Sequence, residues 1–478
     1  MTTEIEIAEL EIAPTEALVC TDGGATRRRV QSIWRLLLAS GGARIVVLPV
    51  SAICGLVVAR LTTLAVGIDL FGAVMLVAML SQLLMFADLG AGAAVATGRA
   101  RAHESRTGTQ EFQRTMLTAI RTTLGAAVVL GVAATVIGLL GAWPMLLGMP
   151  DNHFGADANI AAVLTLLAFS VSLPFALGAD VLRGSGRLHE AVLIAGVSGP
   201  ASLAMTAGLY VLKAPPLAYA LPIPIGVLLG YISSATRARH TDKHILSGLL
   251  RKVFRPRRFP GLAISATAAP MFAVMIGLPL ALNSDRIVLS HRVNAASLSD
   301  YSYVAQLYTP LWSVISVAGL ALWPHFAADN LTVGAQRKSW LTGLAILGTA
   351  GLVAASGFLL LSPVAVQWMS AGTSHPGWSL LLAFAALLVV QSVHLGSGIM
   401  LISPQQLRFQ AACVFALVVT NLPLSWLLAG TMGAAGPLWA SAITVAACQL
   451  IPGVIVAHRA TSHRAAAGRH RIVEAARA

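Results

Sequence analysis

The sequence predicts an all-helical polytopic membrane protein with twelve transmembrane helices in two parallel six-helix lobes. Three observations predict this fold class. The 478 residues are 56% hydrophobic and only 11% charged, whereas soluble domains carry about 25% charged residues. Apolar stretches of about 20 residues, the length that crosses a bilayer, recur along the chain. Basic residues gather in alternate connecting loops, as the positive-inside rule requires.

Twelve apolar stretches are long enough to span the membrane as helices. The second is long enough to tilt or to extend beyond the bilayer. The predicted spans are residues 43–66, 70–98, 115–140, 159–181, 191–212, 215–236, 260–282, 301–326, 339–363, 379–402, 410–430 and 434–457.

The basic residues set the predicted orientation. With the N-terminus inside, 26 of the 32 Lys and Arg residues fall in cytoplasmic segments, and only Lys213, Arg286 and Arg292 fall in outer loops. Removing or adding one helix would scramble this asymmetry. We therefore expect a multi-pass protein of the plasma (inner) membrane with both termini in the cytoplasm. The net charge of +13 follows this topology and does not indicate nucleic-acid binding.

Composition shifts divide the chain into five parts. The acidic segment 1–40 lacks a signal-peptide pattern and is predicted to be a disordered cytoplasmic segment. The lobes are residues 41–236 and 260–458. Between them, the basic linker 237–259 has an apolar ILSGLL core, so it is expected to lie on the inner leaflet. Residues 459–478 form a basic cytoplasmic tail.

The two halves resemble each other weakly. DLFGAVMLVAML at 69–80 corresponds in position to SDYSYVAQLYTP at 299–310, and GRLHEAV at 186–192 corresponds to QLRFQAA at 406–412. Each half has six spans, so the repeats are parallel and related by an axis along the membrane normal. A duplication of this kind encloses a central cavity between two lobes, which is the architecture of a transporter.

No catalytic or cofactor motif is present in the sequence. HExxH, GxSxG and Walker A patterns are missing, and the four cysteines have no metal-ligand spacing. We therefore predict no enzyme activity, no metal and no cofactor. A polyprenyl-sugar transferase is the competing enzyme class, but its outer-loop acids would be Asp151, Asp157, Asp285 and Asp300, which form no paired motif.

Charges at membrane depth are the candidate functional residues. Four are basic: Arg44, Arg60, Arg121 and Arg286. Because guanidinium groups pair bidentately with phosphate, a cationic cavity suits an anionic substrate. Interfacial anchoring of Arg44 and snorkelling of Arg60 and Arg121 are the competing interpretations.

Asp88 in the stretch FADLGAG and His394 are the candidate coupling or switch residues. An ionised carboxylate in hydrocarbon costs about 2.5–3.5 kcal/mol on insertion scales, so such residues usually face a bundle interior or a wet cavity. The competing interpretation of Asp88 is a static salt bridge to Arg60 or Arg121. For His394 it is an interhelical hydrogen bond. The small residues after Asp88 favour close helix packing.

Several stretches resemble the Wzx-type polysaccharide flippases of the MATE-like (MOP) superfamily. FADLGAGAAVATGRARA is similar to the family's "aDlGl..a" stretch, and LRGSGRLHEA is similar to the loop after helix four. The segment from NSDRIVLS to WPHFA resembles the helix seven–eight region. The resemblance covers roughly residues 35–458. Two departures are Ser299-Asp300-Tyr301, where "vG.Y" is common, and twelve spans where a MurJ-type lipid II flippase has fourteen.

The resemblance implies two lobes forming a V and export of a polyprenyl-diphosphate-linked oligosaccharide for envelope polysaccharide assembly. By placement, Arg44, Arg60, Arg121 and Arg286 would engage the diphosphate and sugar. We expect alternating access driven by membrane potential or an ion gradient, with membrane lipids and the glycosyltransferases or polymerase of the pathway as partners. The alternatives are a cation-coupled small-molecule exporter of the same fold and a non-transporting scaffold of an envelope-synthesis complex.

Overall fold

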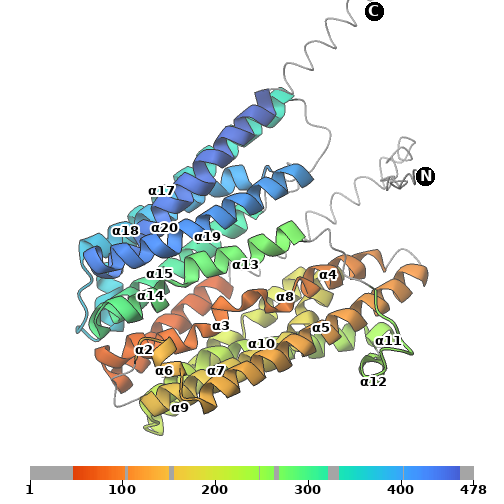
Figure 1. The fold of residues 1–478 in the computed structure, drawn as a ribbon, viewed down its shortest axis with the longest axis horizontal. Helices are drawn as coiled ribbons and strands as arrows, with labels where there is room; N and C mark the ends of the chain where they lie inside the picture. The colour runs from red at the N-terminus through yellow and green to blue at the C-terminus, as the bar shows by residue number, and fades with distance from the viewer. Residues whose placement is uncertain are drawn as a thin grey trace, which may run out of the picture.

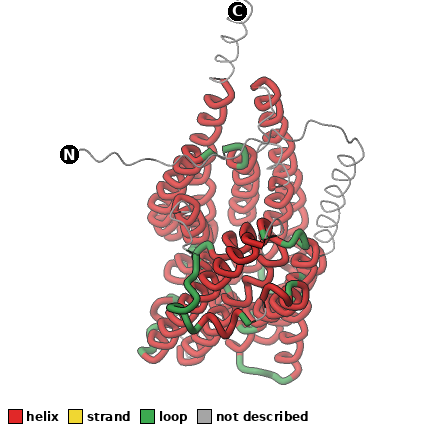
Figure 2. Tube along the Cα trace, turned by 90° about the vertical axis from the view of Figure 1, so that its right-hand side faces the viewer, coloured by secondary structure: helices red, strands yellow, loops and turns green. Residues whose placement is uncertain are grey.

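The computed structural model describes residues 47–102, 106–149, 155–246, 248–262, 269–320, 333–401 and 403–462. Every regular element among these residues is a helix (Figure 2). Eight helical runs in the described part of the chain are long and apolar enough to cross a membrane. The predicted class, an all-helical polytopic membrane protein, is confirmed.

The first half of the chain begins with the helix Val47–Val66 and ends in the linker helices α11 and α12. Its further elements are α2 (Ile68–Ala78), α3 (Leu80–Leu83), η1 (Met85–Asp88), α4 (Ala91–Arg101), α5 (Arg106–Leu139), α6 (Trp143–Leu146), α7 (Gly155–Gly184), α8 (Leu188–Ala195), α9 (Ser198–Val211), η2 (Pro216–Ala220), α10 (Pro222–Thr241), α11 (Lys243–Leu246) and α12 (Leu249–Val253).

The described helices of the second half begin with α13. They are α13 (Ala269–Asn283), α14 (Asp285–Arg292), α15 (Ala295–Leu320), α17 (Val333–Met369), α18 (Trp378–Gly398), α19 (Pro404–Met432), η4 (Gly433–Ala435), α20 (Gly436–Val445) and the π-helical turn η5 (Ala446–Leu450). The last helical run, Gln405–Ser462, has 58 residues. It reverses at Gly433, where φ is 60°, so that α19 and α20 pack side by side (Figure 1). The number of twelve spans stays a prediction.

The predicted second span, 70–98, is broken in the structure. Its helices end at η1, and Leu89 and Gly90 then take φ values of 52° and 75°, in the left-handed region. Asp88 stabilises the break, because its Oδ1 accepts a hydrogen bond of 3.1 Å from the Gly90 N–H. Broken helices at membrane depth occur where the backbone is buried in protein or lines a cavity. Asp88 therefore belongs to a helix break and not to a continuous apolar helix.

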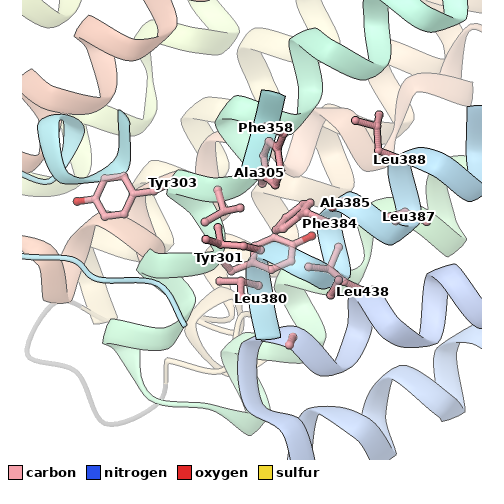
Figure 3. Close-up of a cluster of buried hydrophobic side chains, with 14 of the residues drawn as sticks. Tyr301, Tyr303, Ala305, Phe358, Leu380, Phe384, Ala385, Leu387, Leu388 and Leu438 are labelled. Atoms are coloured by element: carbon pink, nitrogen blue, oxygen red, sulfur yellow. The ribbon is translucent and has the colours of Figure 1, made fainter. Parts of the chain in front are cut away.

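Within each half, one helix contacts most of the others. In the first half α7 packs against α4, α5 and α10, and in the second half α18 packs against α15, α17 and α20 (Figure 1). Glycine allows the closest approach: a Cβ at Gly178 of α7 would meet the backbone of Ala235 in α10. Figure 3 shows part of the core of the second half, where Tyr301 lies against Phe384 with ring centroids 5.4 Å apart, while Tyr303 points away from them.

A buried ion pair fastens the linker to the first half. Arg99, at the end of α4, donates from Nε and Nη2 to the two carboxylate oxygens of Asp242, both at 2.7 Å. Arg99 is only 4% exposed and Asp242 only 7%. Ser185 also donates to Asp242, at 3.2 Å. A bidentate geometry with a further donor compensates for the loss of hydration that burial imposes.

Asp242→Ala is expected to lower the free energy of unfolding by about 3–5 kcal/mol, because it leaves the Arg99 guanidinium buried without a counter-charge. Thermal or denaturant unfolding of the purified protein in detergent measures the change. The matched control is Arg183→Gln, which breaks the 2.8 Å pair with Asp180; since the Arg183 side chain is 57% exposed, at most ~1 kcal/mol is expected. Equal effects of the two variants would contradict a structural role for the Arg99–Asp242 pair.

Candidate functional site

The two halves meet along a contact that we call the seam. It joins the helix Val47–Val66 and α2 of the first half to α15 and the end of α17 of the second. Its residues are Gly55, Arg60, Thr63, Phe71 and Gly72 on one side and Ser299, Tyr303, Gln306 and Trp368 on the other. The seam lies near the end of the helices where the chain turns at Gly67, at Val293 and after Met369.

Aromatic stacking forms the centre of the seam. The rings of Phe71 and Tyr303 are stacked, with centroids 4.0 Å apart and planes 9° apart, and both side chains are fully buried. The Tyr303 and Thr63 hydroxyls are 2.7 Å apart, so the phenol keeps a hydrogen-bond partner in the apolar contact. The centre of the seam is therefore a dry, stacked contact between the two halves.

Gly72 allows the backbones of the two halves to touch. Its N–H donates to Ser299 Oγ at 2.8 Å, and a Cβ at this position would lie only 2.8 Å from the Ser299 backbone nitrogen. The contacting helices are the segments 69–80 and 299–310, which the sequence pairs as repeats. The two segments that the sequence pairs as repeats therefore pack against each other, as expected for segments next to an axis that relates parallel repeats.

Arg60 binds across the seam without a carboxylate partner. Its Nη1 donates to the Trp368 carbonyl oxygen, and its guanidinium carbon lies 4.9 Å from the centroid of the Trp368 ring, a cation–π contact. None of the ion pairs among the described residues includes Arg60. The side chain is half-buried, so part of its positive charge remains available to an anion.

Arg286 lies in α14, which also contacts α2. Its guanidinium carbon is 5.6 Å from the centroid of the Tyr301 ring. The neighbouring carboxylate of Asp285 accepts a 3.3 Å hydrogen bond from the Tyr301 hydroxyl. Arg286 Nε and Asp285 Oδ1 are both buried with no hydrogen-bond partner among the described residues. Unsatisfied buried groups of this kind are rare, and they mark a place where a ligand or a rearrangement can supply partners.

Arg121 lies away from Arg60 and Arg286. It donates from Nε to the Val253 carbonyl at 2.8 Å and from Nη2 to the Lys252 carbonyl at 3.0 Å, so it caps the C-terminal end of α12. The helix α5 has 34 residues and is about 51 Å long, far longer than the ~30 Å hydrocarbon core. Counted from Leu139, Arg121 is about 27 Å along the helix, close to the full thickness of the hydrocarbon core, which puts it near a membrane boundary. Arg44 lies outside the described residues.

Asp88 has a second carboxylate near it instead of the predicted arginine. A Cβ at Gly92 would lie 3.2 Å from Asp88 Oδ2 and 2.5 Å from Asp180 Oδ2, so both carboxylates border the same small residue. Arg183 binds Asp180 at 2.8 Å. In the described part of the chain, Asp88 forms no ion pair with Arg60 or Arg121. The close packing predicted for this stretch is present, since Gly184 of α7 abuts Ala96.

His394 lies inside the second half, in contact with the backbone of Gln449 in the π-helical turn. Its Nδ1 is buried with no hydrogen-bond partner among the described residues. π-Helical turns frequently occur at functional sites. The predicted interhelical contact of His394 is therefore present, and a free ring nitrogen remains.

A polar cluster around Asn421 in α19 was not predicted from the sequence. Its amide donates to the Ala281 carbonyl of α13 at 2.6 Å, and its Oδ1 accepts from Thr444 of α20 at 3.3 Å. Ser425 and Ser441 also hydrogen-bond to Asn421. The sequence feature that indicates this cluster is the polar amide of Asn421 within the apolar run FALVVTNLPLSW. The cluster ties three helices of the second half together.

Neither a family model nor a curated protein matches the sequence. Solved structures do match. An inward-facing multidrug resistance MATE family transporter of the MOP superfamily superposes with a TM-score of 0.60 at 14% identity, over 87% of this chain and 94% of that one. The lipid II flippase MurJ in an inward closed conformation gives 0.58 at 14% identity, over 87% and 86%.

The fold is that of the MOP superfamily of transporters. A third match agrees: the Vibrio cholerae MATE transporter VcmN in the bent form gives a TM-score of 0.52 at 13% identity, over 91% of this chain and 99% of that one. The matched structures are those of transporters and of a lipid flippase. The predicted MATE-like fold of a multi-pass membrane protein is confirmed, and both exporters and a flippase share this fold.

Proposed function

We propose that this chain is a Wzx-like flippase, which moves a polyprenyl-diphosphate-linked oligosaccharide from the cytoplasmic to the outer leaflet of the plasma membrane. The lobes 41–236 and 260–458, with six spans each, act by alternating access. The observation that carries the proposal is Arg60, a seam arginine near a helix end that forms no ion pair with a carboxylate of the described residues. A cation–π contact and one carbonyl leave most of its five N–H donors free for a diphosphate.

The seam gives this arginine a conformational role. The aromatic stack and the Gly72–Ser299 contact hold the lobes together at the end that the basic-loop pattern predicts to be outside, and we take this arrangement as an inward-facing state of the proposed cycle. Arg60 then lies at the closed end of the space between the lobes. A diphosphate that replaces the Trp368 carbonyl as the partner of Arg60 loosens a contact across the seam and thereby favours opening to the outside.

Arg286 is the second basic residue of the proposed substrate site, and it comes from the other lobe. Its unpartnered Nε offers a donor to a phosphate oxygen that reaches α14. Arg44 stays in the proposed site by its predicted placement. Arg121 is not part of the proposed site, because its guanidinium already binds the carbonyl groups of α12.

The proposed coupling groups are Asp88, together with Asp180, and His394. Glycosyltransferases or a polymerase of the glycan pathway are the proposed partners.

A ligand-stabilisation experiment tests the proposed substrate class. A ligand that binds only the folded state raises the unfolding temperature with concentration. We expect a polyprenyl-diphosphate-linked saccharide to stabilise the purified protein, and the matching polyprenyl alcohol, which lacks the diphosphate, to have little effect. Equal stabilisation by both compounds would show that the diphosphate is not recognised.

A cation-coupled exporter is the second candidate function, and one observation favours it. Asp88 and Asp180 place two carboxylates around Gly92 in the first lobe, an arrangement that suits a cation. For this candidate, an organic cation and not the diphosphate lipid stabilises the protein in the same experiment, and Asp88→Asn removes that stabilisation.

A further inference from the structure

A basic pocket lies between α5 and the linker, away from the seam. Its volume is about 190 Å³. Of the nine lining residues, all in the described part of the chain, three are basic and none is acidic. They are Gln110, Gln113, Arg114, Leu117, Leu249, Lys252, Arg258, Phe259 and Pro260. The transport cycle proposed above uses none of these side chains.

Hydrogen bonds from α5 build the pocket by holding the linker in place. Gln113 donates to the Ile245 carbonyl at 3.0 Å, and Arg114 Nε donates to the Pro260 carbonyl at 3.5 Å. Phe259 orients the two linker cations, because Lys252 Nζ and the Arg258 guanidinium carbon lie 5.4 and 6.0 Å from its ring centroid. The pocket is therefore a fixed arrangement of three positive charges on two elements.

The neighbouring linker surface has the composition of a membrane-contacting segment. Phe254 is 81% exposed, and Arg251, Arg255 and Arg257 beside it are exposed as well. A large exposed aromatic side chain among arginines is typical of segments that insert into the headgroup region of an anionic leaflet. Insertion of Phe254 brings the pocket to the level of the lipid phosphates.

We propose that this pocket binds the phosphate group of an anionic phospholipid of the inner leaflet. Arg114 offers a guanidinium fork to the phosphate oxygens, and Lys252 and Arg258 add charge from the opposite wall. Leu117 and Leu249 give an apolar border for the glycerol end of the lipid. A soluble phosphate ester offers the same chemistry from the cytoplasm. In either case the bound phosphate ties α5 to the segment that leads into α13, so it holds the connection between the two lobes.

Native mass spectrometry of the full chain tests this site. The probes are phosphatidylglycerol, phosphatidylcholine and inorganic phosphate. The pocket variant is Arg114→Gln with Arg258→Gln, and the matched control is Arg239→Gln with Lys243→Gln, which removes the same charge from exposed linker positions outside the pocket and outside the surface around Phe254. Each basic residue near an anionic group contributes roughly fivefold in affinity, so we expect about 25-fold weaker phosphatidylglycerol retention in the pocket variant.

Selective retention of phosphatidylglycerol over phosphatidylcholine that is lost in the pocket variant and kept in the control supports a lipid source. Retention of inorganic phosphate with the same dependence on Arg114 and Arg258 supports the phosphate site with a soluble source. Equal losses in the pocket and control variants, or no preference among the probes, would overturn the proposal. The single variant Arg258→Gln, at an exposed position, provides the same comparison if the double variant does not fold.

Discussion

Arg60→Gln is expected to lower flipping of a polyprenyl-diphosphate-linked saccharide at least tenfold, with an unchanged yield of folded protein. Hydrogen bonds to a charged group contribute about 1.5–3 kcal/mol, which corresponds to roughly 10–100-fold in affinity. The side chain is half-buried at a helix surface, so glutamine fits without a cavity. Arg60→Lys keeps the charge without the fork, and its activity is expected between those of the wild type and glutamine.

The chain contains a matched control for this substitution. Arg292 stacks on Trp426 with 5.1 Å between its guanidinium carbon and the ring centroid, close to the 4.9 Å of Arg60 and Trp368. Only the Arg60 pair crosses the seam, because Arg292 and Trp426 both belong to the second half. Arg292→Gln is therefore expected to change flipping less than about twofold by the same reasoning on charged hydrogen bonds. Similar losses in both variants would point to a general effect of positive charge.

Gly72→Val is expected to abolish transport and leave a folded protein. The first added carbon would lie 2.8 Å from the Ser299 backbone, so the seam cannot close around valine. Overpacking costs about 1–3 kcal/mol or more of folding free energy. Because the two halves separate at the seam in the proposed cycle, they can relieve this strain by moving apart. Vesicle transport assays and the thermal unfolding temperature give the two readouts.

Gly178→Val is the control, since a Cβ there would also meet backbone, that of Ala235, but inside the first half. The helices α7 and α10 do not separate in the proposed cycle, so the strain falls on the fold and the yield of folded protein is expected to drop. If Gly72→Val also fails to fold, the seam is a permanent core and alternating access across it is excluded.

The sequence predicted the fold from hydropathy and loop charge, because the bilayer imposes both directly on a spanning chain. It also paired the segments 69–80 and 299–310, which the structure stacks at the seam. It missed the helix break after Asp88. A hydropathy profile contains no information about the backbone dihedral angles of Leu89. In the sequence, only Gly90 indicated a left-handed turn.

Three features of the structure depend on information that a sequence does not carry. Hydropathy does not show where a helix leaves the membrane, so Arg121 was grouped with Arg60 although α5 extends beyond the bilayer. The partner of Arg99 is Asp242, 143 residues away, and local spacing gives no sign of such a pair. The proximity of Asp180 to Asp88 depends on how α4 packs on α7, which the sequence does not show.

The central claim is tested most directly by reconstituting the purified chain in vesicles that contain a polyprenyl-diphosphate-linked saccharide. A membrane-impermeant reagent that modifies the sugar then measures the fraction exposed on the opposite leaflet over time. Our account predicts that wild-type protein increases this fraction well above that of protein-free vesicles and that Arg60→Gln removes most of the increase. No increase over protein-free vesicles, together with expulsion of an organic cation from the same vesicles, would contradict it.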